Sequence, residues 1–533
     1  MNRRVVFRLA PALTLGIVLS VFAGPLVQAS DGTEPAAPPA IRITPPAPVF
    51  EDAKRLDELA ARRKRVAETV GPKAILIMFS AEPRVYTNDV DYQFRQENNL
   101  YYLTNLGQQR ATLVLMPGNS QLPEVLFLPR RNPAAETWTG HMYSPEEAAQ
   151  LSGIKEIWEA SEFDSFVKAL RSHQAYRPRV ENILLSSLDN SYAVVPAPDV
   201  PLFAAADKNE ASLYLLNFPR EGESREYRQE QRFAATWGKE SGFSIQNASP
   251  MFAAMRLRKS AMELAIMQHA IDISIEAHQR AEAFASRARW EYEVDAQVAY
   301  TFKLRNADNW GYPDIVGCGP NATTLHYEES QGPVKPGQLM LMDVGAEYDH
   351  YSADVTRTFP VNGKFNKEQA EIYQIVYVAQ EAAAKASKPG GSLQTAHQAS
   401  LEVIKDGLLR LGLITDRNSE QYRFWFMHLN GHWLGMNVHD VGGGARFEPG
   451  MTFTNEPGIY VRMDALDNLP KNAENEKFIA AIKPAFEKYR GIGVRIEDDL
   501  VITPDGVRWM TAALPRSIAD IEAFIAKARR DMR

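Results

Sequence analysis

A chain of 533 residues is too long to fold around one hydrophobic core, so two or three domains are expected. Its 66 Asp and Glu residues outnumber its 59 Lys and Arg residues, which gives a net charge of −7 and argues against nucleic acid as a partner. Cys318 is the only cysteine, which excludes an intrachain disulfide, and we expect it to be a small buried side chain rather than a nucleophile.

The first 29 residues have the pattern of an export signal. An arginine-bearing start leads into an apolar stretch, and a small-x-small pattern ends at Ala29. We therefore predict a signal peptide over residues 1–29, cleavage after Ala29, and a protein that is periplasmic or secreted. The alternative is an uncleaved membrane anchor, which Pro11, Pro25 and the shortness of the apolar run disfavour. No later segment has the length and apolarity of a membrane span, so we expect no stable span after signal cleavage.

Residues 30–50 form a Pro/Ala-rich linker in this interpretation. Six prolines lie between positions 35 and 48, and proline can neither continue a helix nor donate to a β-ladder. An extended tether is expected here.

Helical and strand patterns alternate over residues 51–247. Charged residues alternate with Leu, Ala and Val at helical spacing over 52–73, and "AILIMFS" (74–80) predicts a buried strand. Two further strands are predicted at "ATLVLM" (111–116) and "EVLFLP" (124–129), and "SPEEAAQL" (144–151) opens a helix. This alternation is typical of an α/β domain.

Residues 248–533 predict a second, α+β domain. In "SAMELAIMQHAIDISIEAHQRAEAFASRA" (260–288) the apolar positions recur every three or four residues, which predicts a long amphipathic helix. His269 and His278 lie on that helix, where we expect them to be surface or packing residues rather than ligands. Helices are also predicted at 366–387 and 394–411, with several short strands.

Three of the ten histidines stand in "MHLNGHWLGMNVHD" (427–440), at His428, His432 and His439. His428 and His432 have the four-residue spacing of a helical H-E-x-x-H zinc motif. Leu429 stands where that motif needs its glutamate, and two glycines in five residues weaken a helix by about 1 kcal/mol each. The partners of these imidazoles must therefore lie elsewhere in the sequence.

Two aspartates lie in a predicted β-hairpin, "QLMLMDVGAEYDHYSADVTRTF" (338–359). If its turn centres on Tyr348-Asp349, Asp343 and Asp354 face each other with Cβ atoms roughly 5 Å apart. Two carboxylates so close among apolar neighbours are costly, and a cation between them removes the penalty. The alternative is a pair of solvated aspartates on a surface hairpin.

Two glutamates occur in similar settings. "MTFTNEPGIY" (451–460) places Glu456 at the end of a strand, with Pro457 closing the ladder beyond it. "GIGVRIEDDLVI" (491–502) predicts another strand, on which Arg495 and Glu497 share one face. An arginine in that position can hold a ligand carboxylate in one orientation. Taken alone, either glutamate would be read as a solvated strand residue.

The four acids together with one histidine offer more oxygen ligands than a single ion needs. Two ions about 3.5–4 Å apart, bridged by a carboxylate, would satisfy them. A set of oxygen donors with one imidazole favours Mn²⁺, with Co²⁺ or Zn²⁺ as possible substitutes.

At these residues the chain resembles the pita-bread metallopeptidases, and most closely the aminopeptidase P (Xaa-Pro aminopeptidase) family. The stretch "DYQFRQENNLYYLTN" (91–105) is similar to the N-terminal domain signature of that family, and "MRLRKS" (255–260) to the start of its catalytic domain. The remaining motifs follow in the order of the family: "LHY", "DVGAEYDHYSADVTRTFPVNGKF", "GHWLGMNVHDVG", "NEPGIY" and "YRGIGVRIEDDLVIT".

The resemblance implies an α/β N-terminal domain followed by an α+β pita-bread catalytic domain. It implies a site with two Mn²⁺ ions whose ligands are Asp343, Asp354, His432, Glu456 and Glu497. It also implies that His326, His428 and His439 line the substrate pocket and that Arg495 supports the site.

In the implied mechanism a hydroxide bridging the two ions attacks the carbonyl before a prolyl nitrogen. The oxyanion is stabilised by metal and His439, and Glu456 moves a proton toward the leaving nitrogen. The expected partners are proline-containing peptides, and we expect a homo-oligomer.

Two departures from the family pattern leave the substrate length open. Leu429 follows the first histidine where the family usually has glycine, and Asn437 replaces an aspartate before "VHD". The segment between Tyr460 and Arg490 is also longer than in compact bacterial aminopeptidases P and closer to prolidases. A prolidase acting on Xaa-Pro dipeptides is therefore the nearest alternative. A non-catalytic binding protein on the same fold would lack the ligands, all five of which are present here.

Overall fold

The computed structural model describes residues 40–187, 200–216, 227–238, 241–467 and 469–531. The predicted signal peptide, its cleavage site after Ala29 and the first part of the linker lie outside the described residues. The chain forms two compact units, one built mainly from Leu59–Leu215 and Arg225–Gln246, the other from Pro39–Glu58 and Asn247–Arg533. Among the described residues, none of the helices combines the length and the apolarity needed to cross a membrane.

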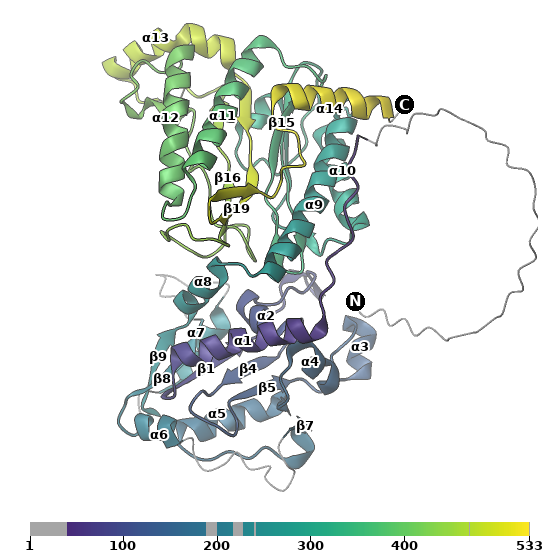
Figure 1. The fold of residues 1–533 in the computed structure, drawn as a ribbon, viewed down its shortest axis with the longest axis vertical. Helices are drawn as coiled ribbons and strands as arrows, with labels where there is room; N and C mark the ends of the chain where they lie inside the picture. The colour runs from purple at the N-terminus through teal and green to yellow at the C-terminus, as the bar shows by residue number, and fades with distance from the viewer. Residues whose placement is uncertain (1–39, 188–199, 217–226, 239–240, 468, 532–533) are drawn as a thin grey trace, which may run out of the picture. The chain divides into compact units, whose positions relative to one another are not determined.

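The first unit contains a mixed seven-stranded sheet (Figure 1). In spatial order its strands are β7 (Ile183–Leu185), β6 (Ile157–Glu159), β5 (Glu124–Leu128), β4 (Thr112–Leu115), β1 (Ala74–Phe79), β8 (Ala211–Leu215) and β9 (Phe243–Asn247). The three strands predicted from apolar runs are β1, β4 and β5, and the helix predicted at residues 144–151 is α4 (Pro145–Ser152). Ser144 caps α4 with a capping box completed by Glu147.

The remaining elements of the first unit are helices and one small hairpin. The helices are α1 (Asp52–Val70, shared with the second unit), α2 (Asn98–Thr104), α3 (Pro133–Thr139), α5 (Phe163–Arg171), α6 (Val200–Ala206) and α7 (Arg228–Thr236). Strands β2 (Val85–Thr87) and β3 (Val90–Asp91) form the hairpin.

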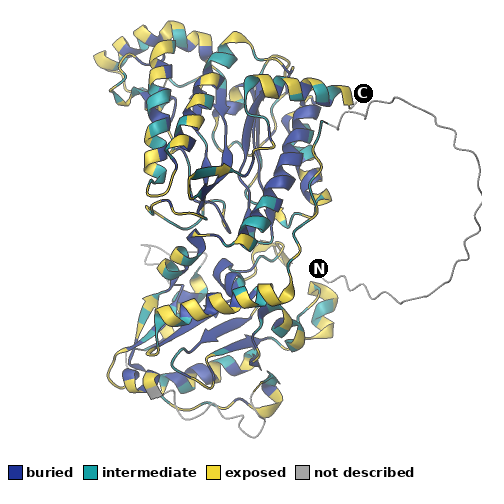
Figure 2. Cartoon of the chain, in the orientation of Figure 1, coloured by how far each residue is buried: buried dark blue, intermediate teal, exposed yellow. Residues whose placement is uncertain are grey.

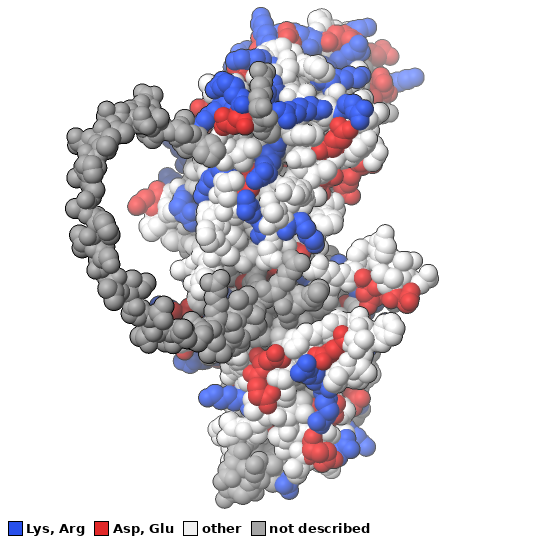
Figure 3. Space-filling model, turned by 90° about the vertical axis from the view of Figure 1, so that its right-hand side faces the viewer, with Lys and Arg blue, Asp and Glu red and all other residues white. Residues whose placement is uncertain are grey.

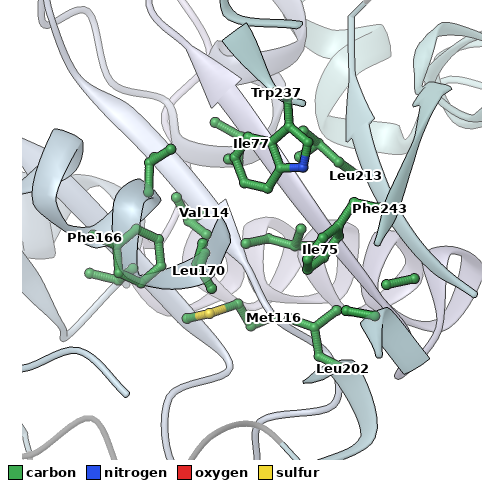
Figure 4. Packing of buried hydrophobic residues seen from close by; sticks show 14 of the residues in the cluster. Ile75, Ile77, Val114, Met116, Phe166, Leu170, Leu202, Leu213, Trp237 and Phe243 are labelled. Carbon is green, nitrogen blue, oxygen red and sulfur yellow. The ribbon is translucent and has the colours of Figure 1, made fainter. Parts of the chain in front are cut away.

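The core of this unit explains why β1 is apolar throughout. All six residues of β1 are buried, which is the pattern of a strand covered on both faces. In Figure 4, Ile75 and Ile77 of β1 pack with Val114, Phe166 and Trp237. Fully burying one such aliphatic side chain is worth about 1.5–3 kcal/mol, so burial of this cluster stabilises the unit.

The second unit is α+β, as its sequence predicts. Its helices are α8 (Ser249–Leu257), α9 (Ala261–Phe284), α10 (Glu291–Leu304), α11 (Lys367–Ala386), α12 (Leu393–Leu411), α13 (Ala473–Tyr489) and α14 (Ile518–Asp531). The three helices predicted in this region are α9, α11 and α12. Figure 2 shows α9 as largely buried along its length.

The two histidines of α9 and the single cysteine are packing residues. The ring of His278 is fully buried, with Nε2 2.9 Å from the carbonyl oxygen of Val355. His269 packs edge-on against Tyr348, with ring centroids 4.5 Å apart. Cys318 is buried at the end of β11 (Ile315–Cys318), and burial raises the pKa of its thiol to about 11, so it is no nucleophile.

The described part of the linker, residues 40–50, forms neither helix nor strand, as expected, but it is not free. Thr44 donates to Glu276 of α9 twice, from the backbone N–H at 2.7 Å and from Oγ1 at 2.6 Å. Arg42 N–H donates to Gln279 Oε1 at 2.6 Å, and its guanidinium lies 3.2 Å from Asp272. Arg42 and Thr44 are therefore bound along α9, beside which the purple trace runs in Figure 1.

The first ligand-bearing hairpin contains β12 (Leu339–Asp343), β13 (Ala346–Tyr348), β14 (Tyr351–Ser352) and β15 (Thr356–Pro360). The predicted pairing of Asp343 with Asp354 is wrong, because Asp343 faces Thr356. The turn lies one residue later than predicted, at Asp349 and His350, which both have positive φ (52° and 69°). Such left-handed pairs favour tight hairpins, and Asp and His tolerate positive φ better than the aromatic Tyr348 would.

The second hairpin has helix α13 in the connection between its two arms. One arm contains β16 (Thr452–Asn455) and β17 (Gly458–Val461), the other β18 (Ile492–Arg495) and β19 (Asp498–Thr503), and β20 (Gly506–Trp509) pairs with β19. The single strand predicted over residues 491–502 is wrong, because the ladder is interrupted at Ile496-Glu497. Pro457 has no N–H to donate, and the partner strand is interrupted at Glu456-Pro457. The pairs on either side, Asn455 with Asp498 and Gly458 with Arg495, keep one register, which places Glu456 opposite Glu497.

Candidate metal centre

The four predicted acidic ligands and His432 come from the two hairpins and the loop beside them. Asp343 ends β12, and Asp354 stands between β14 and β15. Glu456 and Glu497 occupy the two sides of the interruption in the second hairpin. We call this interruption, residues 456–457 and 496–497, the hairpin gap.

The loop that carries His432 is held against β16 by backbone hydrogen bonds. His432 accepts from Thr454 N–H at 2.9 Å, and its own N–H donates to Thr454 Oγ1 at 3.1 Å. A Cβ atom at Gly431 would lie 2.0 Å from the carbonyl oxygen of Thr454, so only glycine allows this close approach. The glycine that argues against a helix is therefore what brings the imidazole to the acids.

Four of the five predicted ligands converge on one point. His432 Nε2 lies 3.2 Å from Asp354 Oδ2 and 3.4 Å from Glu456 Oε1. Asp354, His432 and Glu497 each offer a ligand atom, and these atoms all lie within 4.8 Å of one another. This spacing is suited to ligands that share one or two cations.

Asp343 joins this cluster through Arg495. Its carboxylate forms an ion pair with the Arg495 guanidinium and accepts a hydrogen bond from Tyr312 at 2.5 Å. Arg495 Nε donates to Thr356 Oγ1 at 3.1 Å, and that hydroxyl donates to Glu497 Oε2 at 2.6 Å. Arg495 thus connects Asp343 to Glu497 and is buried with them.

The electrostatics of the cluster fit a site for cations. Burial raises the pKa of Asp354 and of Glu497, and raises that of Glu456 to about 7; neighbouring carboxylates add to each shift. Burial lowers the pKa of His432, but Asp354 and Glu456 outweigh it and bring that pKa to about 9. The residues therefore cannot carry their full negative charge at neutral pH without added positive charge. Bound divalent cations supply that charge, so the donor set fits a metal centre.

Two of the three pocket histidines have clear surroundings. His428 Nδ1–H donates to the carbonyl oxygen of Leu429 at 2.7 Å, which leaves Nε2 to accept from Tyr460 O–H at 2.9 Å. Arg495 Nη1 donates to the same Tyr460 oxygen at 2.9 Å. Burial and the charge of Arg495 lower the pKa of His428 to about 3, so its imidazole is neutral. The ring of His439 stands 4.2 Å from that of His432.

His326 is exposed on the loop after the short 3₁₀ turn Gly319–Thr323. It lies close enough to His428 and His439 to disfavour their protonated forms. The three histidines therefore gather around the same cluster of ligands.

Several residues that shape the site were not predicted from the sequence. Tyr312, Tyr460 and Thr356 donate hydrogen bonds to the predicted residues, and the buried Asp499 accepts from Asp354 N–H at 3.1 Å. Tyr460 and Asp499 stand inside quoted motifs, so a search for polar neighbours of the ligands could have found them. Tyr312 lies outside the quoted motifs, so no sequence pattern indicated its role.

Comparison with known proteins now identifies the family. The description "Metallopeptidase family M24" matches residues 265–504, and "Aminopeptidase P, N-terminal domain" matches residues 59–180. The chain is 34% identical over 476 residues to the Xaa-Pro aminopeptidase of Haemophilus influenzae, covering 87% of this chain and 96% of that protein. The chain belongs to the aminopeptidase P family. The resemblance seen in the sequence is thereby confirmed.

Solved structures of aminopeptidase P agree with this assignment. The Pseudomonas aeruginosa aminopeptidase PepP is 30% identical, with a TM-score of 0.72, covering 90% of this chain and 99% of that chain. A variant of Escherichia coli aminopeptidase P in complex with substrate is 29% identical, with a TM-score of 0.70, covering 89% and 99%. The fold prediction, an α/β N-terminal domain and a pita-bread catalytic domain, is confirmed.

The visible charge distribution is mixed. On the face shown in Figure 3, acidic and basic side chains are interspersed. This is the surface expected of a protein with a modest net negative charge.

Proposed function

We propose that the chain is a metal-dependent Xaa-Pro aminopeptidase, which releases the N-terminal residue from peptides with proline in the second position. The observation that carries the proposal is the convergence of Asp354, His432 and Glu497, with ligand atoms within 4.8 Å of one another and with both carboxylates buried. The relatives named Xaa-Pro aminopeptidase, matched along nearly their whole length, support the substrate class.

Two Mn²⁺ ions are the proposed cofactors, with Co²⁺ or Zn²⁺ as possible substitutes. Asp343, Asp354, His432, Glu456 and Glu497 would hold them. When bound, such ions supply a water molecule acidic enough to act as a nucleophile at neutral pH.

Glu456 is the proposed proton carrier. One carboxylate oxygen accepts from Thr454 Oγ1 at 3.2 Å, and the other lies 3.8 Å from His428 Nδ1. A carboxylate in this position can take up a proton and pass it on, here toward the leaving prolyl nitrogen.

The histidines act on the substrate carbonyl in this proposal. His439 is exposed beside His432, where it can donate to the developing oxyanion. His428 is kept neutral and oriented by Tyr460 and the carbonyl of Leu429, so it can contact substrate without adding a charge. His326 completes this side of the pocket.

A prolidase is the second candidate, because Leu429 and the long segment after Tyr460 depart from the family pattern. The relatives favour the aminopeptidase. Hydrolysis of an Xaa-Pro dipeptide and of an Xaa-Pro-Xaa tripeptide should be compared after loading with Mn²⁺. We expect cleavage of the tripeptide; cleavage confined to the dipeptide would select the prolidase instead.

Export and self-association are further parts of the proposal. The arginine-bearing, apolar N-terminus supports export to the periplasm or medium with cleavage after Ala29. N-terminal sequencing of protein from the native host should begin at Ser30. We also propose a homo-oligomer, which light scattering on the mature protein would test.

A further inference from the structure

Gln380, in the middle of α11, lies directly behind the hairpin gap. Its side chain is fully buried, and its Nε2 atom has three acceptors: Asn455 O at 3.0 Å, Ile496 O at 3.1 Å and Asp498 Oδ2 at 2.8 Å. Asn455 returns a bond, donating from Nδ2 to the backbone oxygen of Gln380 at 2.9 Å. One amide therefore contacts both strands at the point where they cease to pair.

The gap creates a need for such a group. Backbone carbonyls inside a sheet are normally paired across the ladder, and a buried carbonyl without a partner is disfavoured. Asn455 still pairs with Asp498, and Ile496 N–H still donates to Pro457 O at 3.3 Å, but Pro457 has no N–H to return to the carbonyl of Ile496. The amide of Gln380 donates to that carbonyl in place of the absent N–H, and it also donates to Asn455 O on the opposite strand.

The same side of the gap is fixed by a buried ion pair. Arg357 Nη2 lies 2.6 Å from Asp498 Oδ1, and Arg357 Nη1 donates to Glu497 O at 2.7 Å. Thr511 Oγ1 donates to Asp498 Oδ1 at 2.5 Å. Arg357, Thr511 and Gln380 thus all contact the Asp498 carboxylate, which stands next to a predicted metal ligand.

We infer that Gln380 is a positioning residue for the metal centre: it holds the hairpin gap in the shape that directs Glu456 and Glu497 toward His432 and Asp354. Two of its acceptors belong to the residues directly before these glutamates, and the third follows Glu497. Without Gln380 the buried carbonyl of Ile496 loses its partner, and the backbone that carries both carboxylates is no longer held in its present position. The inference rests on the proposed function, because the role requires that the cluster bind metal.

A matched pair of variants on one helix tests the inference. Gln380→Met removes the amide and keeps a similar volume. Gln369→Met does the same at a buried glutamine of α11 whose Nε2 donates to Gly337 O at 2.8 Å, a contact with no residue of the hairpin gap. Metal-free wild type and both variants are titrated with Mn²⁺ by calorimetry, and their thermal unfolding is recorded without metal.

The expected result is a loss of Mn²⁺ affinity only in Gln380→Met. Residues that orient metal ligands typically contribute about 10–100-fold in affinity, so we expect at least a tenfold loss there and less than a twofold loss in Gln369→Met. Both variants should unfold at lower temperature than wild type, because each loses buried hydrogen bonds. At saturating Mn²⁺, Gln380→Met should show a lower kcat with little change in KM.

If Gln380→Met does not fold, Gln380→Asn replaces it, since it keeps the amide but is one methylene too short to reach both strands. A folded variant at position 380 with wild-type Mn²⁺ affinity would overturn the inference while leaving the proposed function intact. A wild-type protein that binds no Mn²⁺, Co²⁺ or Zn²⁺ would overturn the proposed function itself.

Discussion

Removal of metal should make the stability of the catalytic unit fall as pH rises from 5 to 9. Burial raises the pKa of Glu456 to about 7 in the folded, metal-free protein, from an unfolded value near 4.5. A carboxyl group whose folded pKa is raised stabilises the fold fully below its unfolded pKa, and that stabilisation is lost as pH rises through the folded pKa. One pKa step is worth about 1.4 kcal/mol, so ionising Glu456 costs about 3 kcal/mol between pH 4.5 and 7.

His432 extends the effect in the same direction. Its pKa is raised to about 9, because Asp354 and Glu456 outweigh the effect of burial, so the stabilisation it provides as a cation is lost between pH 6.5 and 9. The two shifts share the contact between His432 and Glu456 and therefore do not add in full. For a unit of this size, a loss of 3 kcal/mol lowers the unfolding temperature by roughly 5 °C.

Calorimetry on chelator-treated protein at pH 5, 7 and 9 measures this dependence, with Mn²⁺-loaded protein as the comparison. The metal-free protein should unfold at a progressively lower temperature as pH rises. The difference in unfolding temperature between the Mn²⁺-loaded and metal-free proteins should increase with pH, because metal binds the deprotonated ligands. Glu456→Gln should flatten the change between pH 5 and 7. Metal-free stability that stays constant or rises over that interval would refute the reasoning.

Three further predictions concern the site and the linker. Asp354→Ala or His432→Ala should abolish hydrolysis of Xaa-Pro peptides with little change in the circular dichroism of the first unit; full turnover in either would refute the ligand assignment. Tyr460→Phe should lower kcat by about tenfold, since His428 and Arg495 lose their shared partner, and steady-state kinetics should show little change in KM. Thr44→Val should lower the free energy of unfolding by about 1–2 kcal/mol in urea titrations, because it removes a hydrogen bond to the Glu276 carboxylate; an unchanged midpoint would mean that the linker is bound too weakly to matter.

The parts of the fold that were predictable are those with a period or a long apolar run. Helix α9 has apolar residues every three or four positions, and β1 is apolar at every position because it is covered on both faces. Both signals are local. The part of the linker at Arg42 and Thr44 shows the limit of such reasoning, since proline content predicts an extended backbone but not the carboxylates of α9 that bind it.

The hairpin carrying Asp343 and Asp354 could be predicted, but its register could not. The predicted turn was one residue early, which moved the partner of Asp343 by two positions to Asp354 instead of Thr356. Because side chains alternate between faces, an error of two residues keeps the same face, and this is why the two aspartates still belong to one cluster. An error of one residue would have removed Asp354 from it.

The interruption of the second hairpin is the feature that sequence patterns conceal most completely. Alternation continues through Arg495 and Glu497 as if the strand were unbroken, and Pro457 indicates the break on only one of the two strands. The break leaves buried carbonyls whose partners come from Gln380 and Arg357, 75 or more residues away in the chain. Short-range patterns therefore identify the ligands, whereas the groups that orient them become visible only when distant segments are packed together.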